Sequence, residues 1–570
     1  MPLRRAASAA RRAQSAPVIG PGDPPAPGGL RLLPDSRTRL IAGGLVLVGG
    51  SPIRVLRLTP TGARQVAGWF SGAPVGGDAA RTLARRLLDA GIANPGWSAS
   101  TATVTTGSAT TGSASAASGR APGVQDVTVV IPVRDRHAEL ARCLGGLVGN
   151  ATAPGFPCRP QVIVVDDASA APQAIAAIAA ARGARVIRRP VNGGPGAARN
   201  TGLAAASTEF VAFLDSDCVP APGWLDGLLP HFADPAVGAV APRIVPHEAG
   251  TTWLARYEGA SSTLDMGARP SIVRPGARVG YVPGAALVVR RTAAGDGFAD
   301  GMFVGEDVDF VWRMSAAGWR VRYEPTAVMG HDHRVRFRAW FSRRADYGTS
   351  AAVLEQLHPG AVRPLYASWW TVGAWTAALA GRPVAATALT AAATALLARR
   401  LSRVTGERWP IPAAPQPAPD NSKKREAHGP PGDNSKKAVA APCPVRDGLT
   451  HDTRKPETHA DAWRLAARLA GGGTVAAGRP LGSAVSRTWW PLAVPAAIAF
   501  PRLRCPVAAL ILAPPLLDWA DRRPPLDPAR YVAARLLDDA AYSLGVWQGC
   551  LKRRTIRPLL PALGSRPRRG

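Results

Sequence analysis

Short apolar runs recur through the middle of the chain, and stretches long enough to form helices separate them. The runs at 127–133, 162–165 and 210–214 are nearly continuous, which is typical of parallel strands buried on both faces. Residues 138–148 predict a helix after the first run, and 185–188 predict a shorter strand. Strands that alternate with helices in this order indicate strand–helix–strand units with right-handed crossovers. The pattern therefore predicts an α/β fold.

Carboxylates follow two of these predicted strands. Asp166 and Asp167 end one strand, and Asp215 and Asp217 follow another with only Ser216 between them. Hard divalent cations such as Mg²⁺ and Mn²⁺ prefer oxygen ligands and commonly hold a substrate's phosphates. Open α/β sheets also bind their ligands at the carboxyl ends of the strands. An isolated Asp-x-Asp is usually a solvated turn, so its interpretation depends on the surrounding segments.

A glycine-rich segment, Asn192-Gly-Gly-Pro-Gly-Ala-Ala-Arg-Asn200, lies between these carboxylate pairs. A glycine-rich loop that opens a helix offers backbone N–H groups and a positive dipole end to phosphate. It partly matches a dinucleotide fingerprint, but that fingerprint would follow the first strand. Here it follows the third, and the next strand ends at Asp215. The order favours a nucleotide diphosphate with a metal over NAD.

Two further polar clusters follow downstream. The strand-like stretch 281–290 precedes Glu306 and Asp307, which open a helical stretch, and His331 and His333 come after another strand. Acids in the first turn of a helix often serve only its dipole. Two imidazoles spaced by one residue lie on one side of an extended segment, as a metal site could use. Ordinary surface or packing histidines are the alternative.

In this order, the segments resemble inverting family 2 glycosyltransferases of the GT-A fold, a Rossmann-like mixed sheet that binds nucleotide sugars. The resemblance extends over about 125–347. Further stretches, including 45–58, 305–313 and 536–542, are similar to the glycosyltransferases of mycofactocin biosynthesis.

The resemblance implies roles for individual residues. Asp307 would be the catalytic base, with Glu306 orienting it. Asp217 would bind Mg²⁺ or Mn²⁺, and either His331 or His333 would be a further metal ligand or a phosphate contact, His331 being preferred. The residues implied to border the nucleotide sugar are Pro132, Asp135, Asp166, Asp167, Asn192, Gly193, Arg199 and Asp215.

The implied reaction is an inverting transfer of glucose from a UDP-sugar to mycofactocin, a peptide-derived redox cofactor, in which a short β-linked glucose oligomer is built. Processive polysaccharide synthases of the superfamily usually carry Gln-x-x-Arg-Trp after the base, whereas 340–347 reads Trp-Phe-Ser-Arg-Arg-Ala-Asp-Tyr. Two alternatives stay open. One is a lipid or cell-wall polysaccharide acceptor; the other is a membrane-associated scaffold that binds a sugar nucleotide or precursor peptide without turnover.

The flanking segments predict a modular chain. The predicted parts are a disordered arm (1–29), a small winged-helix-like domain (30–97), a flexible linker (98–123), the catalytic domain (124–347), an apolar helical region (348–400), a disordered insertion (401–460), a second apolar helical region (461–560) and a basic tail (561–570). Within the small domain, 53–58 and 79–90 predict helices. This domain resembles those that bind precursor peptides in peptide-derived cofactor pathways.

Composition adds the cellular setting. The 570 residues carry a formal net charge of +30, but the Ala, Gly, Pro and Arg excess is typical of a GC-rich genome. Basic motifs interleaved with aromatic residues and zinc-ligand spacings do not occur, which argues against nucleic acid as a partner. The six cysteines show no paired spacing, which favours a reducing cytosol.

Apolar runs near the carboxyl end suggest contact with a membrane. They lie at 365–380, 384–397, 489–500 and 507–517, each shorter than the roughly 20 residues needed to span a bilayer. Taken together, 365–397 could span, although Arg382 would then lie within the membrane. Clustered tryptophans and flanking arginines favour an interfacial location. We therefore expect a cytoplasmic protein associated with the inner face of the membrane, with a packed helical appendage as the alternative.

Overall fold

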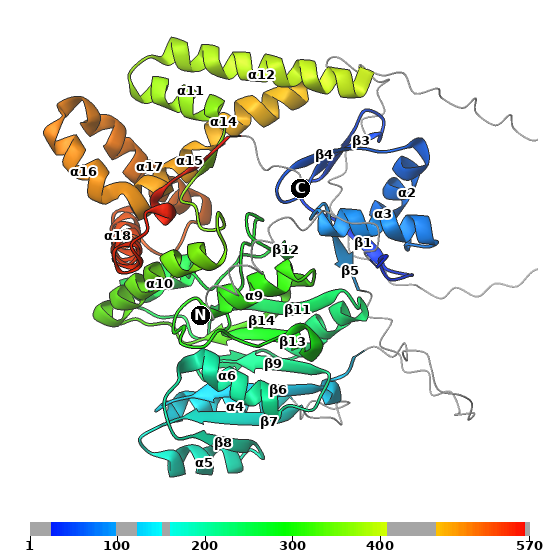
Figure 1. The fold of residues 1–570 in the computed structure, drawn as a ribbon, viewed down its shortest axis with the longest axis vertical. Helices are drawn as coiled ribbons and strands as arrows, with labels where there is room; N and C mark the ends of the chain where they lie inside the picture. The colour runs from blue at the N-terminus through cyan, green and yellow to red at the C-terminus, as the bar shows by residue number, and fades with distance from the viewer. Residues whose placement is uncertain (1–23, 98–121, 151–159, 407–462, 565–570) are drawn as a thin grey trace, which may run out of the picture.

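The computed structural model describes residues 24–97, 122–150, 160–406 and 463–564. Most of the predicted arm, linker, insertion and tail lies outside these residues. A large sheet with helices on both faces fills the lower half of the view, the small amino-terminal unit lies at its upper right, and the carboxyl-terminal helices lie above it and to the left (Figure 1). The predicted α/β fold is confirmed.

The central sheet has nine strands, eight of them in the order β10-β14-β11-β13-β9-β6-β7-β8, with β12 paired to β14. Strands β9, β6, β7 and β8 run parallel to one another, whereas β13 runs antiparallel to β9 and β11. The strands are β6 (Val127–Val133), β7 (Gln161–Asp167), β8 (Arg185–Arg189), β9 (Phe210–Leu214), β10 (Cys218–Pro220), β11 (Val237–Pro246), β12 (Ser271–Val273), β13 (Ala286–Arg290) and β14 (Arg320–His331).

Alternation along β6 explains why its sequence is apolar at almost every position. Val127, Val129 and Ile131 pack into a core on one face, and Val130 packs into a separate core on the other. Helices cover both faces, so side chains of either parity are buried. The helices are α4 (His137–Asn150), α5 (Pro172–Ala180), α6 (Gly194–Ala205), α7 (Trp224–Leu228), α8 (Trp253–Ser261), α9 (Glu306–Ala316) and α10 (Phe337–Leu357).

The small amino-terminal unit combines two helices with two short sheets. Its elements are β1 (Arg31–Pro34), β2 (Arg39–Ile41), β3 (Val46–Gly49), β4 (Arg54–Arg57), α2 (Pro60–Phe70), α3 (Asp78–Asp89) and β5 (Ala93–Gly96). The helix predicted at 53–58 is wrong, because β4 pairs with β3 residue by residue, with Val55 opposite Val48. Residues 24–29, expected in a disordered arm, pack on α3, and Ala26 is fully buried there.

Buried ion pairs join this unit to the central domain. Arg85 contacts Asp234 at 2.7 Å, and Asp89 contacts Arg320 at 3.0 Å. Both pairs are largely excluded from solvent, so removing one partner would leave a buried charge unpaired. The small unit is therefore docked on the catalytic sheet.

Where the structure describes it, over 366–406 and 463–564, the carboxyl-terminal region is mostly helical, with one short pair of strands. Its elements are β15 (Tyr366–Ala367), α11 (Trp369–Leu379), α12 (Pro383–Gly406), short helical segments over 467–489, α16 (Trp490–Ala499), α17 (Arg504–Arg522), α18 (Pro528–Arg553) and β16 (Ala562–Leu563). Helix α18 lies along α10 (Figure 1). Helix α10 itself crosses the predicted domain boundary at residue 347 and thereby links the central sheet to this region.

Two helices of this region are longer than their apolar runs implied. Pro383–Ser402 and Pro501–Arg522 are each long and apolar enough to cross a membrane, by length and composition, and only 11% of each is buried. The apolar runs themselves are shorter than these helices, which extend beyond them at both ends, so membrane contact by α12 and α17 stays a prediction.

Candidate active site

A cavity of about 860 Å³ opens at the carboxyl ends of the parallel strands. Parallel packing of β6, β7 and β9 brings the residues that follow them to one edge of the sheet, and α6 and α9 begin over the same edge. The residues proposed from sequence that line the cavity are Pro132, Asp167, Asn192, Arg199, Asp215, Asp217, Glu306, Asp307 and His331.

The other three residues lie beside the cavity and shape its loops. Asp135 adopts a left-handed backbone (φ 56°) and accepts a hydrogen bond from Ala170 N–H at 2.6 Å. Asp166 accepts one from Ser169 N–H at 2.9 Å and pairs with Arg188. Gly193 donates to Asp167. These contacts hold the loops after β6 and β7 and the start of α6 at the rim of the cavity.

Asp167 joins the end of β7 to the start of α6. Its two carboxylate oxygens accept the backbone N–H groups of Gly193 and Gly194, at 3.1 and 2.9 Å, and Arg189 pairs with it at 2.8 Å. Gly194 has φ +83°, and a Cβ there would meet the Phe303 ring at 2.7 Å. Glycine is therefore required at this position on both backbone and steric grounds.

Arg199 is a buried cation shared by two acids from different elements. It contacts Asp215 at 2.7 Å and Glu306 at 2.9 Å. Burial would lower the pKa of Arg199, but these two carboxylates raise it. Burial and the neighbouring Asp307 raise the pKa of Glu306, and Arg199 partly offsets this rise. The three side chains thus tie α6, the end of β9 and α9 into one charged network.

Asp307 is held at the first turn of α9 by backbone groups. Its carboxylate oxygens accept the N–H of Gly284 at 2.8 Å and the N–H of Val308 at 2.8 Å. The start of a helix favours a negative charge. The sequence assigned the orienting role to Glu306, whereas here two backbone donors orient Asp307 and Glu306 contacts Arg199.

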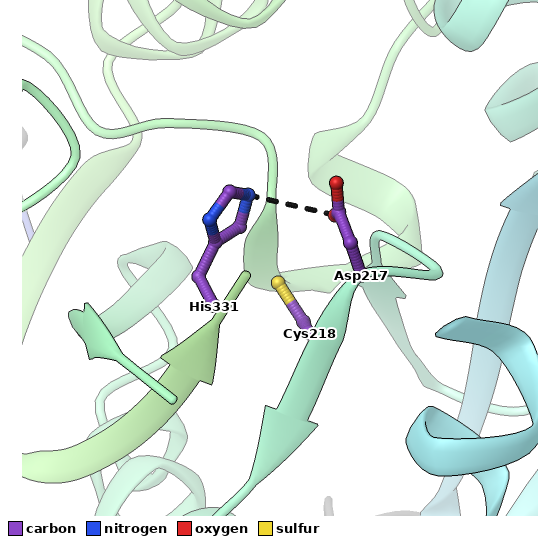
Figure 2. Close-up of side chains that lie close together, drawn as sticks. All are labelled: Asp217, Cys218 and His331. Carbon is purple, nitrogen blue, oxygen red and sulfur yellow. Dashed lines mark ion pairs between the residues drawn. The ribbon is translucent and has the colours of Figure 1, made fainter. Parts of the chain in front are cut away.

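A carboxylate and an imidazole face each other across β10 and β14. Antiparallel pairing places Cys218 opposite His331, and this brings His331 Nε2 to 3.5 Å from Asp217 Oδ1 (Figure 2). Burial would raise the pKa of Asp217, but His331 and Arg136 outweigh it and the net shift is downward. An ionised carboxylate beside an imidazole is a donor set that suits a divalent ion.

The Cys218 thiol lies within 4.8 Å of the same ligand atoms. It donates a hydrogen bond to the Ala285 carbonyl at 3.5 Å, and burial raises its pKa well above the ordinary value. Only a thiolate is a good metal ligand, so Cys218 packs beneath the pair and the oxygen and nitrogen donors remain.

The two histidines left open by sequence differ in environment. His331 lines the cavity, whereas the His333 ring lies behind it, with the two Nδ1 atoms 3.4 Å apart. Burial, His331 and Arg344 lower the pKa of His333 to about 4. These positions favour His331 as the group available to a ligand in the cavity.

The cavity also contains residues that sequence analysis did not single out. Arg136 and Arg334 lie near Asp217. Arg136 directly follows Asp135, and Arg334 lies three residues after His331. Arg487 and Tyr542 come from the carboxyl-terminal region. Tyr542 ends the stretch 536–542, which the sequence marked without a role.

The chain is similar in sequence to known glycosyltransferases. The family model described as "Glycosyl transferase family 2" matches residues 128–294. The chain is 37% identical over 547 residues to the "Pre-mycofactocin glycosyltransferase" of Mycobacterium tuberculosis, covering 94% of this chain and 98% of that protein. The "Succinoglycan biosynthesis protein ExoW" of Rhizobium meliloti is 44% identical over 105 residues, covering 17% of this chain and 31% of that protein.

The chain also has a weak likeness to solved glycosyltransferase structures. A mannosyltransferase from Pyrobaculum calidifontis is 22% identical with a TM-score of 0.32, covering 47% of this chain and 75% of that one. Glucosyl-3-phosphoglycerate synthase from Mycobacterium tuberculosis is 21% identical with a TM-score of 0.29, covering 40% of this chain and 79% of that one. The family match and the mixed sheet with its covering helices confirm the GT-A fold expected from sequence.

Proposed function

The chain belongs to glycosyl transferase family 2, and on this premise we propose that it transfers glucose from UDP-glucose to pre-mycofactocin with inversion. The observation that carries the proposal is one cavity shared by Asp307 and the Asp217–His331 pair. A base and a diphosphate-binding pair in one cavity are what a single displacement at the anomeric carbon requires.

The donor would occupy the side of the cavity formed by the parallel strands. Pro132, Asp167 and Asn192 line the part proposed for the nucleoside. Asp215 also lines the cavity and precedes Asp217, the proposed metal ligand, by two positions in the chain. Asp135, Asp166 and Gly193 support this part through the loop contacts described above. The guanidinium groups of Arg136 and Arg334, near Asp217, would bring positive charge to the diphosphate.

Asp217 and His331 fit a divalent ion, and we propose that they hold Mg²⁺ or Mn²⁺. The fit rests on an ionised carboxylate and an imidazole nitrogen 3.5 Å apart on neighbouring strands. When bound, such an ion neutralises the negative charge of the departing diphosphate.

Asp307 would act as the general base. Its carboxylate accepts the proton of the acceptor hydroxyl while the hydroxyl oxygen forms a bond to the anomeric carbon. The bond between that carbon and the diphosphate oxygen breaks on the opposite face, and UDP leaves with the electron pair. Base catalysis of this kind contributes roughly 10²–10⁴-fold to the rate. The ion pair between Glu306 and Arg199 fixes the start of α9 relative to α6.

The acceptor and its setting form the finer part of the proposal. We expect successive transfers to build a short β-linked glucose oligomer, and the small amino-terminal unit to bind the precursor peptide. The exposed helices α12 and α17 favour association with the inner face of the membrane, as do Trp369 and Trp370, which are 65% and 45% exposed. The same exposed helices make a lipid-linked acceptor the second candidate.

Mass spectrometry of a reconstituted reaction tests the proposal. Purified full-length protein is incubated with UDP-glucose, pre-mycofactocin and Mg²⁺ or Mn²⁺. Products heavier by one or more hexoses, absent with Asp307→Asn, are the expected result. Hydrolysis of UDP-glucose without an acceptor product would reject pre-mycofactocin and leave the lipid-linked acceptor. An absence of turnover with any sugar nucleotide would reject the enzyme and favour the binding scaffold.

A further inference from the structure

The wall of the cavity beyond Asp307 is built by helices outside the family-model match. Tyr347 lies on α10, Tyr542 on α18, and Arg487 on the short helical segment before α16. Two guanidinium groups lie over the tyrosine rings: Arg487 is 4.5 Å from the centre of the Tyr542 ring, and Arg343 is 4.8 Å from that of Tyr347. This wall therefore alternates aromatic rings with hydrogen-bond donors.

The wall lies next to the proposed base. Burial raises the pKa of Tyr281 to about 12, and the neighbouring Tyr542 and Asp307 both add to the rise. Tyr281, Asp307, Tyr347 and Tyr542 all line the same cavity, so the wall and the proposed base face one space.

Two acids on one face of α18 hold Tyr542 in place. Asp538 and Asp539 lie about one helical turn before Tyr542, so all three share one side of the helix. Asp538 accepts a hydrogen bond from Tyr257 Oη at 2.9 Å, and Asp539 accepts one from Ser486 Oγ at 2.6 Å. Within the stretch 536–542, the hydrogen bonds of Asp538 and Asp539 therefore fix the helix that carries Tyr542.

Glycines let α18 approach α10 closely enough for Tyr542 to reach the cavity. A Cβ at Gly348 would lie 2.1 Å from the Tyr542 carbonyl oxygen, and one at Gly545 would lie 1.8 Å from the Ala345 carbonyl oxygen. The two backbones are therefore in direct contact at this crossing, which leaves no room for side chains between them.

We propose that Tyr542 and Arg487, with Tyr347 and Arg343, form the acceptor subsite and that they bind a hydroxylated ring. The proposal rests on the function proposed above. Ring faces pack on tyrosine rings, and guanidinium N–H groups donate to hydroxyl oxygens. The carboxyl-terminal region is in this view a part of the catalytic site that selects the acceptor.

Steady-state kinetics of Tyr542→Ala in the full-length protein test the subsite. The KM for pre-mycofactocin is expected to rise about tenfold relative to the KM for UDP-glucose, since one ring contact is lost. Leu544→Ala is the matched control, because Leu544 is 41% exposed on the same helix; it should keep the kinetics of the parent protein. An unchanged ratio of the two KM values in Tyr542→Ala would overturn the proposal.

A second variant tests the same proposal if Tyr542→Ala does not fold. Tyr347→Ala changes a ring on a different helix and should raise the same KM ratio; an unchanged ratio there, with parental melting temperature, would also overturn the subsite.

Failure of the proposed function gives a different result. The parent protein would then hydrolyse UDP-glucose without modifying pre-mycofactocin. The subsite would still be decided by calorimetric titration with phenyl β-D-glucopyranoside in the presence of UDP and Mg²⁺. Binding that Tyr542→Ala weakens supports the subsite, and no binding to the parent protein overturns it.

Discussion

The two walls of the cavity are built in different ways. The proposed donor wall, which includes Asp167, Asn192, Asp215 and Asp217, consists of polar residues at or just after strand ends, each within a recognisable motif. Backbone N–H groups hold the loops of this wall. The proposed acceptor wall consists of Arg343 and Tyr347 on α10, Tyr542 on α18 and Arg487 on the short segment before α16, and its geometry depends on contacts between residues about 200 apart in the chain.

Asp307→Asn should have the largest effect, because it should remove turnover while leaving donor binding in place. The amide cannot take the acceptor proton, so kcat should fall by roughly 10²–10⁴-fold, while donor binding by the strand-end wall should remain. Rapid-quench or mass-spectrometric turnover and calorimetric titration of UDP measure the two quantities. Asp300→Asn, an exposed change in the loop before α9, is the control; loss of turnover there too would point to a misfolded loop.

Asp217→Ala should affect the donor wall alone. Removing the carboxylate of the proposed metal pair should weaken metal-dependent UDP-glucose binding by at least about tenfold. Titration with and without EDTA measures this effect, which EDTA should reproduce in the parent protein. Equal binding by variant and parent in Mn²⁺ would argue against a metal at Asp217.

Gly545→Ala should affect the acceptor wall alone. The added methyl group meets the Ala345 carbonyl, so α18 must shift away from α10, at a cost of roughly 1–3 kcal/mol in unfolding free energy. Thermal melting should show the loss, and the KM for the acceptor should rise. Gly473→Ala is the matched control, because a Cβ at that helical position meets open space. A variant as stable as the control would contradict the close crossing.

The smallest expected effect is a pH dependence of opposite sign in the two walls. Burial raises the pKa of Asp539 despite Arg487 and Arg535. The folded state therefore binds more protons than the unfolded state above pH about 3.8, and this group's contribution to stability falls as pH rises. Asp539→Asn should reduce the decline of the melting temperature between pH 4 and 7.

Asp166 should behave in the opposite way. Burial opposes ionisation, but Ser169 and Arg188 outweigh it and lower the pKa of Asp166. Its stabilising contribution is present above the unfolded pKa and is lost as pH falls through the lower folded value. Asp166→Asn should reduce the melting temperature at pH 7, and the deficit should shrink toward pH 3. For each variant, the difference in melting temperature from the parent protein is compared across pH. Differences that change in the same direction with pH for both variants would contradict this assignment.

The sequence predicted which strand-end residues meet at one edge of the sheet, because the signals for the strands are local. Apolar runs fix β6, β7 and β9, and parallel strands must deliver their ends to one edge, so Asp167 and Asp215 meet there. The helix predicted at 53–58 was wrong because pairing with β3 overrides a weak local preference. The contact of Glu306 with Arg199 depends on how α6 packs against α9, which no spacing reveals.

The sequence by itself determined the α/β order, the strand-end carboxylates and the glycines that open α6, because each follows from periodicity or backbone geometry over fewer than about ten residues. Only the tertiary structure decided that Tyr542 and Arg487 reach the same cavity as Asp307. Their place is set by the contact of two helix backbones at Gly348 and Gly545. Such a contact joins distant parts of the chain and leaves no periodic pattern in the sequence.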